Sequence, residues 1–320
     1  MKGDLILSDG SGSLPSLQAG TASVNPAISY LRDLSSKLSR QTMISTLNCT
    51  ARHLGANSLH DCNWSALNRD AVRWVIALLQ ELDYSPATIG TYRSAIRGVA
   101  REAWIAGLIS ASEFEMIKLV KPAKGKRIPK GRSLTTDEVQ ALLGLAESDP
   151  GSLLAVRDTA IVAIFVGAGL RRAEVAGLNL GDVLLSDMAL KVRGKGNKER
   201  LAFLPNSLWK HLVKWIDMRG DVDGPLFIRI RRHETMTSDA LSTSGVYHII
   251  ETRRKELGIE YFSPHDLRRT FASHMLNAGV DLFTLKDALG HENLSTTERY
   301  NKRGVDRQKA ARDMLDYGWR

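Results

Sequence analysis

Residues 263–274 have the sequence SPHDLRRTFASH, which combines a helix start with a group of charged side chains. Ser263 suits an N-cap and Pro264 suits the first helical position, so we expect a helix to begin here. His265 and Arg268 are three residues apart in its first turn, on one side and beside unpaired backbone N–H groups, a setting that favours an anion. A metal site that includes His274 is excluded, because the two histidines would lie more than two turns apart and the ligand set is incomplete.

A second charged group follows the most apolar stretch of the chain. Residues 160–170 are all apolar or glycine, so we expect a buried helix at about 155–167. It ends near Gly169 and presents Arg171, with Glu174 three residues further on and on the same helical face. An arginine and a glutamate at this spacing more often form a surface ion pair, so this motif alone is weak evidence of a site.

A β-hairpin is predicted next, with strands at 188–193 and 199–204. Gly194 and Gly196 flank Lys195, so the backbone turns tightly and the ammonium group extends from the tip. A lysine in this position can bring a proton to a phosphate oxygen. Solvated hairpin lysines are nevertheless common, and Lys198 is a rival for any role given to Lys195.

The last motifs follow a predicted helix that starts at Asp281 and stops at Gly290. His291 comes directly after this helix end, within Leu-Gly-His, and Tyr300 lies nine residues beyond it. A single histidine or tyrosine at such a position most often serves packing.

Helical periodicity also marks the first third of the chain. Apolar residues at three- and four-residue spacing predict a helical bundle, with helices at 26–38, 40–55, 68–82 and 85–107. Asn68 is the expected N-cap of the third helix, and Ser85 with Pro86 begins the fourth.

These elements define the expected domains. Residues 1–24 are rich in serine and glycine and are expected to be a flexible tail. Residues 25–120 form the helical domain, and 121–132, KPAKGKRIPKGR, form a basic interdomain linker. The second domain, 133–320, opens with a helix at 136–147 through a capping box of Thr135 and Glu138. Beyond the hairpin we expect only helices, so the fold class is mainly α with a small β-hairpin or sheet.

The overall charge points to a polyanionic partner. The 320 residues contain 44 Lys and Arg against 35 Asp and Glu, a formal net charge of +9, and nucleic acid is the leading candidate. Two cysteines, Cys49 and Cys62, are too few for a disulfide framework. No stretch resembles a signal peptide or is long enough to cross a bilayer, so we expect a cytoplasmic, nucleoid-associated protein with no membrane partner.

Taken together and in this order, the motifs closely resemble those of the tyrosine recombinase (phage integrase) family. The match consists of Arg-x-x-Glu at 171–174, Gly-Lys-Gly at 194–196, His-x-x-Arg at 265–268, Leu-Gly-His at 289–291 and the tyrosine at 300. The helical domain, including TIGTYRSAIR at 88–97, is more weakly similar to the family's core-binding domain. The chain lacks a strand-rich arm-binding module and therefore resembles the two-domain Xer and Cre class.

The resemblance implies roles for six catalytic residues, Arg171, Lys195, His265, Arg268, His291 and Tyr300. The tyrosine would attack a DNA phosphodiester and form a 3′-phosphotyrosine, while the arginines hold the non-bridging oxygens. The lysine would protonate the departing 5′ oxygen. Of the histidines, the first is the best acceptor for the tyrosine proton and the second would hydrogen-bond the phosphate. Glu174 would support the arginines. No cofactor or metal is expected.

The expected function is site-specific DNA recombination, in integration, excision or resolution of DNA elements such as a mobile element. The implied partners are double-stranded DNA with a specific recombination site, three further copies of the chain in a homo-tetramer on two sites, and optionally an accessory DNA-bending protein. Candidate DNA contacts are Lys121, Lys124, Lys126, Arg127, Lys130 and Arg132 in the linker, and Arg93 and Arg97 in helix 85–107. Two alternatives remain open: a type IB topoisomerase and a catalytically silent DNA-binding protein.

Overall fold

The computed structural model describes residues 25–298 except 124, 126–130 and 195–197. By its internal contacts the chain divides into two compact units, residues 1–129 and 130–320. The division falls inside the predicted linker 121–132. The predicted tail, 1–24, lies outside the described residues.

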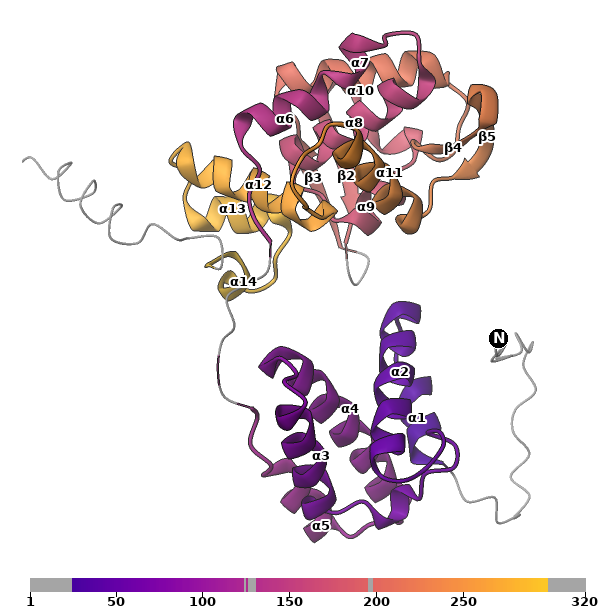
Figure 1. The fold of residues 1–320 in the computed structure, drawn as a ribbon, viewed down its shortest axis with the longest axis vertical. Coiled ribbons are helices and arrows are strands. Elements are labelled where there is room, and N and C mark those ends of the chain that lie inside the picture. Colours follow the sequence, from indigo (N-terminus) through magenta and orange to yellow (C-terminus); the bar gives the residue numbers. More distant parts are fainter. Residues whose placement is uncertain (1–24, 124, 126–130, 195–197, 299–320) are drawn as a thin grey trace, which may run out of the picture. The chain divides into compact units, whose positions relative to one another are not determined.

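The first unit is a bundle of helices around its own apolar core (Figure 1). Its helices are α1 (Pro26–Arg32), α2 (Lys37–His53), α3 (Arg69–Glu81), α4 (Pro86–Ile105) and α5 (Ala111–Lys118). The expected caps form: the Asn68 side chain accepts from the backbone N–H of Ala71, and that of Ser85 accepts from Thr88. α1 ends earlier than predicted, and the sequence pattern did not predict α5.

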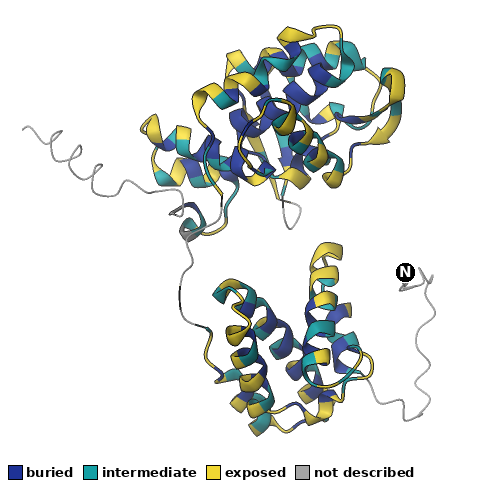
Figure 2. Cartoon of the chain, in the orientation of Figure 1, coloured by how far each residue is buried: buried dark blue, intermediate teal, exposed yellow. Residues whose placement is uncertain are grey.

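The second unit is built around α8 (Leu153–Ala168), in which every residue from Ala155 onward is buried (Figure 2). α10 and α12 pack against it, and the predicted capping box of Thr135 and Glu138 begins α6. The other helices are α6 (Thr136–Leu143), α7 (Leu145–Ser148), α9 (Arg172–Ala176), α10 (Asn206–Arg219), α11 (Thr243–Glu256), α12 (Pro264–Asn277), α13 (Leu282–Leu289) and α14 (Leu294–Glu298). The predicted helix 136–147 is thus two helices, divided at Gly144.

Two small antiparallel sheets complete this unit. β2 (Ala189–Arg193) and β3 (Glu199–Phe203) form the predicted hairpin, and the short β1 (Val183–Leu184) pairs with β2. β4 (Ile228–Arg231) and β5 (Thr235–Ala240) form a second hairpin. The fold class, mainly helical with small sheets, is confirmed.

The expectation of only helices after the first hairpin is wrong. In β4, isoleucines that face the core alternate with exposed Arg229 and Arg231, which is the period of a strand. The turn carried no sequence signal, because His233 and Glu234 both adopt positive φ without a glycine. The Glu234 carboxylate accepts from Ser152 and from the backbone N–H of Leu153 at the start of α8, which holds the turn in place.

Candidate active site

The site is centred on Arg268, whose side chain is almost fully buried where α8, α12 and α13 meet. α12 starts where predicted, with the Asp266 carboxylate accepting from the backbone N–H and hydroxyl of Ser263. The Arg268 guanidinium donates to the backbone oxygens of Gly169 and Leu289, the latter at 2.7 Å. These oxygens lie at the C-terminal ends of α8 and α13, where the helix dipole attracts a cation.

Arg171 is the N-cap residue of α9 and follows directly after the turn that ends α8. Gly169 makes this turn in the left-handed conformation, at φ 60°. Nη1 of Arg171 lies 2.7 Å from Oε1 of Glu174, and Nη2 donates to the backbone oxygen of Gly290 at 2.9 Å. The Arg171 side chain is 42% exposed whereas that of Glu174 is 5% exposed. Arg171 is therefore accessible to a ligand, and the buried Glu174 carboxylate holds its guanidinium in place.

His291 has a defined tautomer in this geometry. Its Nε2 lies 2.8 Å from Nη2 of Arg268, and because a guanidinium only donates, Nε2 must accept. The ring proton is then on Nδ1, 2.9 Å from the buried hydroxyl of Thr297. Burial, together with the charges of Arg268 and Arg171, lowers the pKa of His291 to about 4. The ring is neutral at physiological pH.

His265 lies in the first turn of α12, close enough to the arginines to respond to their charge. Its side chain is exposed on one side, but desolvation by the surrounding protein atoms, followed by the charges of Arg268 and Arg269, lowers its pKa below the usual histidine range. Arg171 adds to this effect. The structure thus brings four of the six predicted catalytic residues together: Arg171, His265, Arg268 and His291.

The other two predicted catalytic residues, Lys195 and Tyr300, lie outside the described residues. The rival lysine, Lys198, forms an exposed ion pair with Glu292 at 3.0 Å. This contact links the start of β3 to the loop after α13.

Sequence reasoning missed two residues of this cluster. Arg200 on β3 donates to both oxygens of Glu174, and Thr297 on α14 holds the ring of His291. Neither had a distinctive local signal, since one is an arginine in a half-exposed strand and the other a threonine in a polar run.

Arg171, Arg200 and Arg268 all donate hydrogen bonds to the C-terminal end of α13. At the C-terminus of α13 the consecutive backbone oxygens of Ala288, Leu289 and Gly290 accept from Arg200, Arg268 and Arg171 respectively. These carbonyls have no partner within the helix, so cations satisfy them. The result is a concentration of positive charge suited to a phosphate group. No cluster of three or more His, Cys, Asp or Glu side chains that could hold a metal ion occurs within the described parts of the chain.

The residues predicted to contact DNA differ in how exposed they are and in whether their side chains already have a partner. Lys121 is exposed, whereas Arg132 is half-buried and donates to both carboxylate oxygens of Glu138 at 2.7 Å. Arg93 and Arg97 lie close together on α4, and Nε of Arg93 donates to the backbone oxygen of Val120. The remaining linker cations lie outside the described residues: Lys124, Lys126, Arg127 and Lys130.

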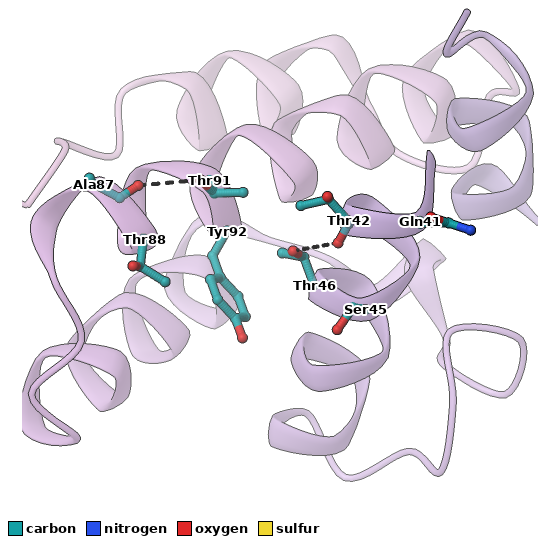
Figure 3. Close-up of a pocket in the computed structure, with 8 residues that line it drawn as sticks. All are labelled: Gln41, Thr42, Ser45, Thr46, Ala87, Thr88, Thr91 and Tyr92. Carbon is teal, nitrogen blue, oxygen red and sulfur yellow. Dashed lines mark hydrogen bonds between the residues drawn. The ribbon is translucent and has the colours of Figure 1, made fainter. Parts of the chain in front are cut away.

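The first unit also has a hollow between α2 and α4, with a volume of about 670 Å³ (Figure 3). Its lining is polar and uncharged, and Tyr92 points into the space between the two helices. The residues around it are Gln41, Thr42, Ser45, Thr46, Ala87, Thr88, Thr91 and Tyr92. Hydroxyl and amide groups of this kind hydrogen-bond equally well to phosphate oxygens and to base edges.

In the part of the chain that the structure describes, no helix has the length and apolar character needed to cross a membrane.

Comparison with known proteins gives concordant results. The phage integrase family model matches residues 132–306. Tyrosine recombinase XerC of Vibrio parahaemolyticus is 32% identical over 259 residues, covering 79% of each chain. XerA of Pyrococcus horikoshii is 34% identical over 240 residues, covering 75% of this chain and 77% of the relative.

Solved structures share the fold. The Tn1549 transposon integrase in complex with transposon right end DNA has a TM-score of 0.65 at 16% identity, covering 91% of this chain and 98% of the other. A lambda integrase dimer bound to a COC′ core site has a TM-score of 0.62 at 19% identity, covering 88% and 77%. The chain belongs to the phage integrase family and is a tyrosine recombinase, an enzyme that cleaves and rejoins DNA strands.

Proposed function

We propose that Tyr300 is the nucleophile of this recombinase and that the arginine cluster at the end of α13 binds the scissile phosphate. The phenolic oxygen attacks phosphorus, the bond to the 5′ oxygen breaks, and a 3′-phosphotyrosine forms. Lys195 gives a proton to the departing 5′ oxygen, which becomes a free hydroxyl. That hydroxyl later attacks a partner phosphotyrosine and rejoins the strand.

The observation that carries this proposal is the accessible positive charge of Arg171, together with the buried positive charge of Arg268 at the same helix end. Negative charge spreads over the non-bridging oxygens during attack, and fixed guanidinium groups stabilise it without rearranging. Both side chains are already held in place by backbone oxygens, so the site is organised before DNA binds.

The histidines have separate roles in the proposal. His265, neutral because its pKa is lowered, accepts the proton of Tyr300. A phosphate oxygen cannot donate a hydrogen bond, so His291 needs a proton on Nε2 in order to bind it. We propose that His291 takes up this proton when DNA enters, because an adjacent anion raises the pKa of an imidazole. Nε2 then donates to the phosphate oxygen and no longer accepts from Arg268.

DNA binding is assigned to both units and to the linker. In the first unit the hollow between α2 and α4, with Arg93 and Arg97, is the proposed contact surface. In the linker we assign phosphate contacts to the cations other than Arg132, whose guanidinium is committed to Glu138. The proposed assembly is a homo-tetramer on two duplex sites, with room for an accessory DNA-bending protein. The proposed location is the cytoplasm, at the nucleoid, and the reaction serves integration, excision or resolution.

A covalent-capture experiment tests the nucleophile. Wild-type protein is incubated with a nicked suicide duplex that carries its recombination site, and the products are separated on a denaturing gel. We expect an adduct with wild type and none with Tyr300→Phe, which removes one hydroxyl and no charge and so leaves DNA affinity nearly unchanged.

Tyr317→Phe is the matched control and should form the adduct at the wild-type rate. An adduct that persists in Tyr300→Phe and disappears in Tyr317→Phe would refute the assignment. Exchange between two duplexes, measured in parallel, separates recombination from simple relaxation of one duplex.

A further inference from the structure

Arg200 on β3 is half-buried and reaches across to the catalytic cluster. Its Nη1 and Nη2 lie 3.1 and 2.9 Å from the two carboxylate oxygens of Glu174, a bidentate contact. Nε donates to the backbone oxygen of Ala288 at 3.3 Å. The side chain is 15% exposed, against 42% for Arg171, so Arg200 is poorly placed to contact a ligand itself.

Glu174 is shared between two arginines. It accepts from the backbone N–H and Nη1 of Arg171 as well as from Arg200. Burial alone would raise the pKa of Glu174, but the hydrogen bonds from Arg200 and Arg171 outweigh it and hold the pKa below its usual range. The carboxylate is therefore ionised, and it cancels one of the two positive charges.

This sharing decides the charge that the site offers to a phosphate. With Arg200 present, the three side chains together carry one net positive charge. Without Arg200, the buried Glu174 would pair with Arg171 alone, and the pair would be neutral. A phosphate would then compete with a buried carboxylate for the same guanidinium.

Arg200 also lies against the glycine of the Leu-Gly-His motif. A Cβ at Gly290 would come within 3.0 Å of Cδ, Nε and Cζ of Arg200. Gly290 also has φ of 62°, which disfavours a side chain independently. The guanidinium therefore fits into the space that the glycine leaves, beside the loop that carries His291.

We propose that Arg200 is a positioning residue for strand cleavage: it neutralises Glu174, so that Arg171 keeps its charge for the scissile phosphate, and it fixes the end of α13. This inference rests on the proposed function of Arg171. Arg200 acts through Glu174 and touches no reacting atom.

The first test is the rate of adduct formation at saturating suicide duplex. We expect Arg200→Ala to lower this rate roughly tenfold to a hundredfold, as is common for groups that orient catalytic ligands. Arg200→Lys, which keeps the charge and loses the bidentate geometry, should fall between Arg200→Ala and wild type. A rate for Arg200→Ala equal to that of wild type would overturn the proposal.

The decisive comparison removes the charge of Glu174. In a Glu174→Gln background no carboxylate competes for Arg171, so adding Arg200→Ala should cost at most about fivefold, far less than in the wild-type background. This pair decides the matter even if Arg200→Ala alone does not fold, because the double variant buries no unpaired carboxylate. An undiminished loss in the Glu174→Gln background would refute the charge-balancing role.

Binding supplies a readout that does not depend on catalysis. In a Tyr300→Phe background, Arg200→Ala should reduce the slope of log affinity against log salt by about one for a half-site duplex, and Glu174→Gln should restore it. These slopes remain measurable if wild type forms no adduct, so a failure of the proposed function is distinguishable from a failure of this inference. An unchanged slope would overturn the inference.

Arg219 offers a matched control. It is a half-buried arginine of the same unit that donates to the backbone oxygens of Pro225 and Gly220, away from the site. Arg219→Ala should lower the melting temperature and leave the cleavage rate of the folded protein and the salt slope unchanged. If it slows cleavage as much as Arg200→Ala does, the effect of Arg200 is merely structural and the proposal is wrong.

Discussion

The buried hydroxyl of Thr297 lies 2.9 Å from Nδ1 of His291 and accepts the proton that the contact between Nε2 and Arg268 places on that nitrogen. Thr297→Val keeps the shape and removes the acceptor, leaving a partly buried N–H without its partner. We expect cleavage to slow roughly tenfold, with Thr297→Ser close to wild type. The Nδ1 proton signal of His291 in NMR spectra reports the tautomer directly. Equal rates for the valine and serine variants would contradict this role.

The low pKa of His291 predicts acid sensitivity. In the unfolded chain an imidazole titrates with a pKa of about 6.5, whereas the pKa of His291 in the fold is about 4. Between these values the unfolded chain binds a proton that the folded ring does not, so the free energy of unfolding decreases as the pH falls through this window. Above it the contribution of this ring is constant.

Thermal unfolding at pH 7 and pH 5 measures this effect. The melting temperature of His291→Gln should decrease less between pH 7 and pH 5 than that of wild type. The exposed His274 provides the control, because the melting temperature of His274→Gln should decrease as much as that of wild type. His265 and His211, whose pKa values burial also lowers, add to the same trend and account for the remainder. An identical loss in His291→Gln would show that its ring is not held neutral.

Cleavage is expected to survive chelation. In the proposed mechanism the arginines and Lys195 supply the positive charge that metal ions provide in other phosphoryl-transfer enzymes. Adduct formation in excess EDTA should therefore stay within about twofold of that in magnesium. Loss of cleavage in EDTA with recovery on adding magnesium would overturn the mechanism.

The linker should contribute to affinity without sequence preference. Neutralising one cation that binds a phosphate reduces the salt slope by about 0.9, so removing five linker charges should flatten the slope by up to about 4.5 and weaken binding to all duplexes alike. The substitutions are to glutamine at Lys121, Lys124, Lys126, Arg127 and Lys130. Arg132→Gln is the contrasting variant: it breaks the pair with Glu138, so it should lower stability and leave the slope unchanged. A slope that stays constant in the five-residue variant would make the linker a spacer only.

Local signals in the sequence predicted those helix starts that carry an N-cap residue. Caps such as Asn68, Ser85 and Asp281 satisfy backbone N–H groups within three residues, so they depend on nothing distant. The turn between β4 and β5 was not predictable in this way, because a contact between Glu234 and the start of α8, 80 residues away, holds it.

The same distinction applies to the site. The motif residues were recognisable from their order along the chain, whereas Arg200 looks like an ordinary strand arginine. Arg200 becomes part of the site because its Nε donates to the backbone oxygen of Ala288 at the end of α13, which is 88 residues away in the sequence. Thr297 likewise acquires its role only when α14 folds back onto His291.

The end of α13 constrains the length of the chain as well as its chemistry. Because three consecutive backbone oxygens, at Ala288, Leu289 and Gly290, accept from arginines on three separate elements, each position has its own partner. Inserting or deleting a single residue here would shift every carbonyl to the wrong guanidinium and rotate His291 away from Arg268. The contacts made by these backbone oxygens therefore depend on the spacing of residues 288–290 rather than on the side chains at these positions.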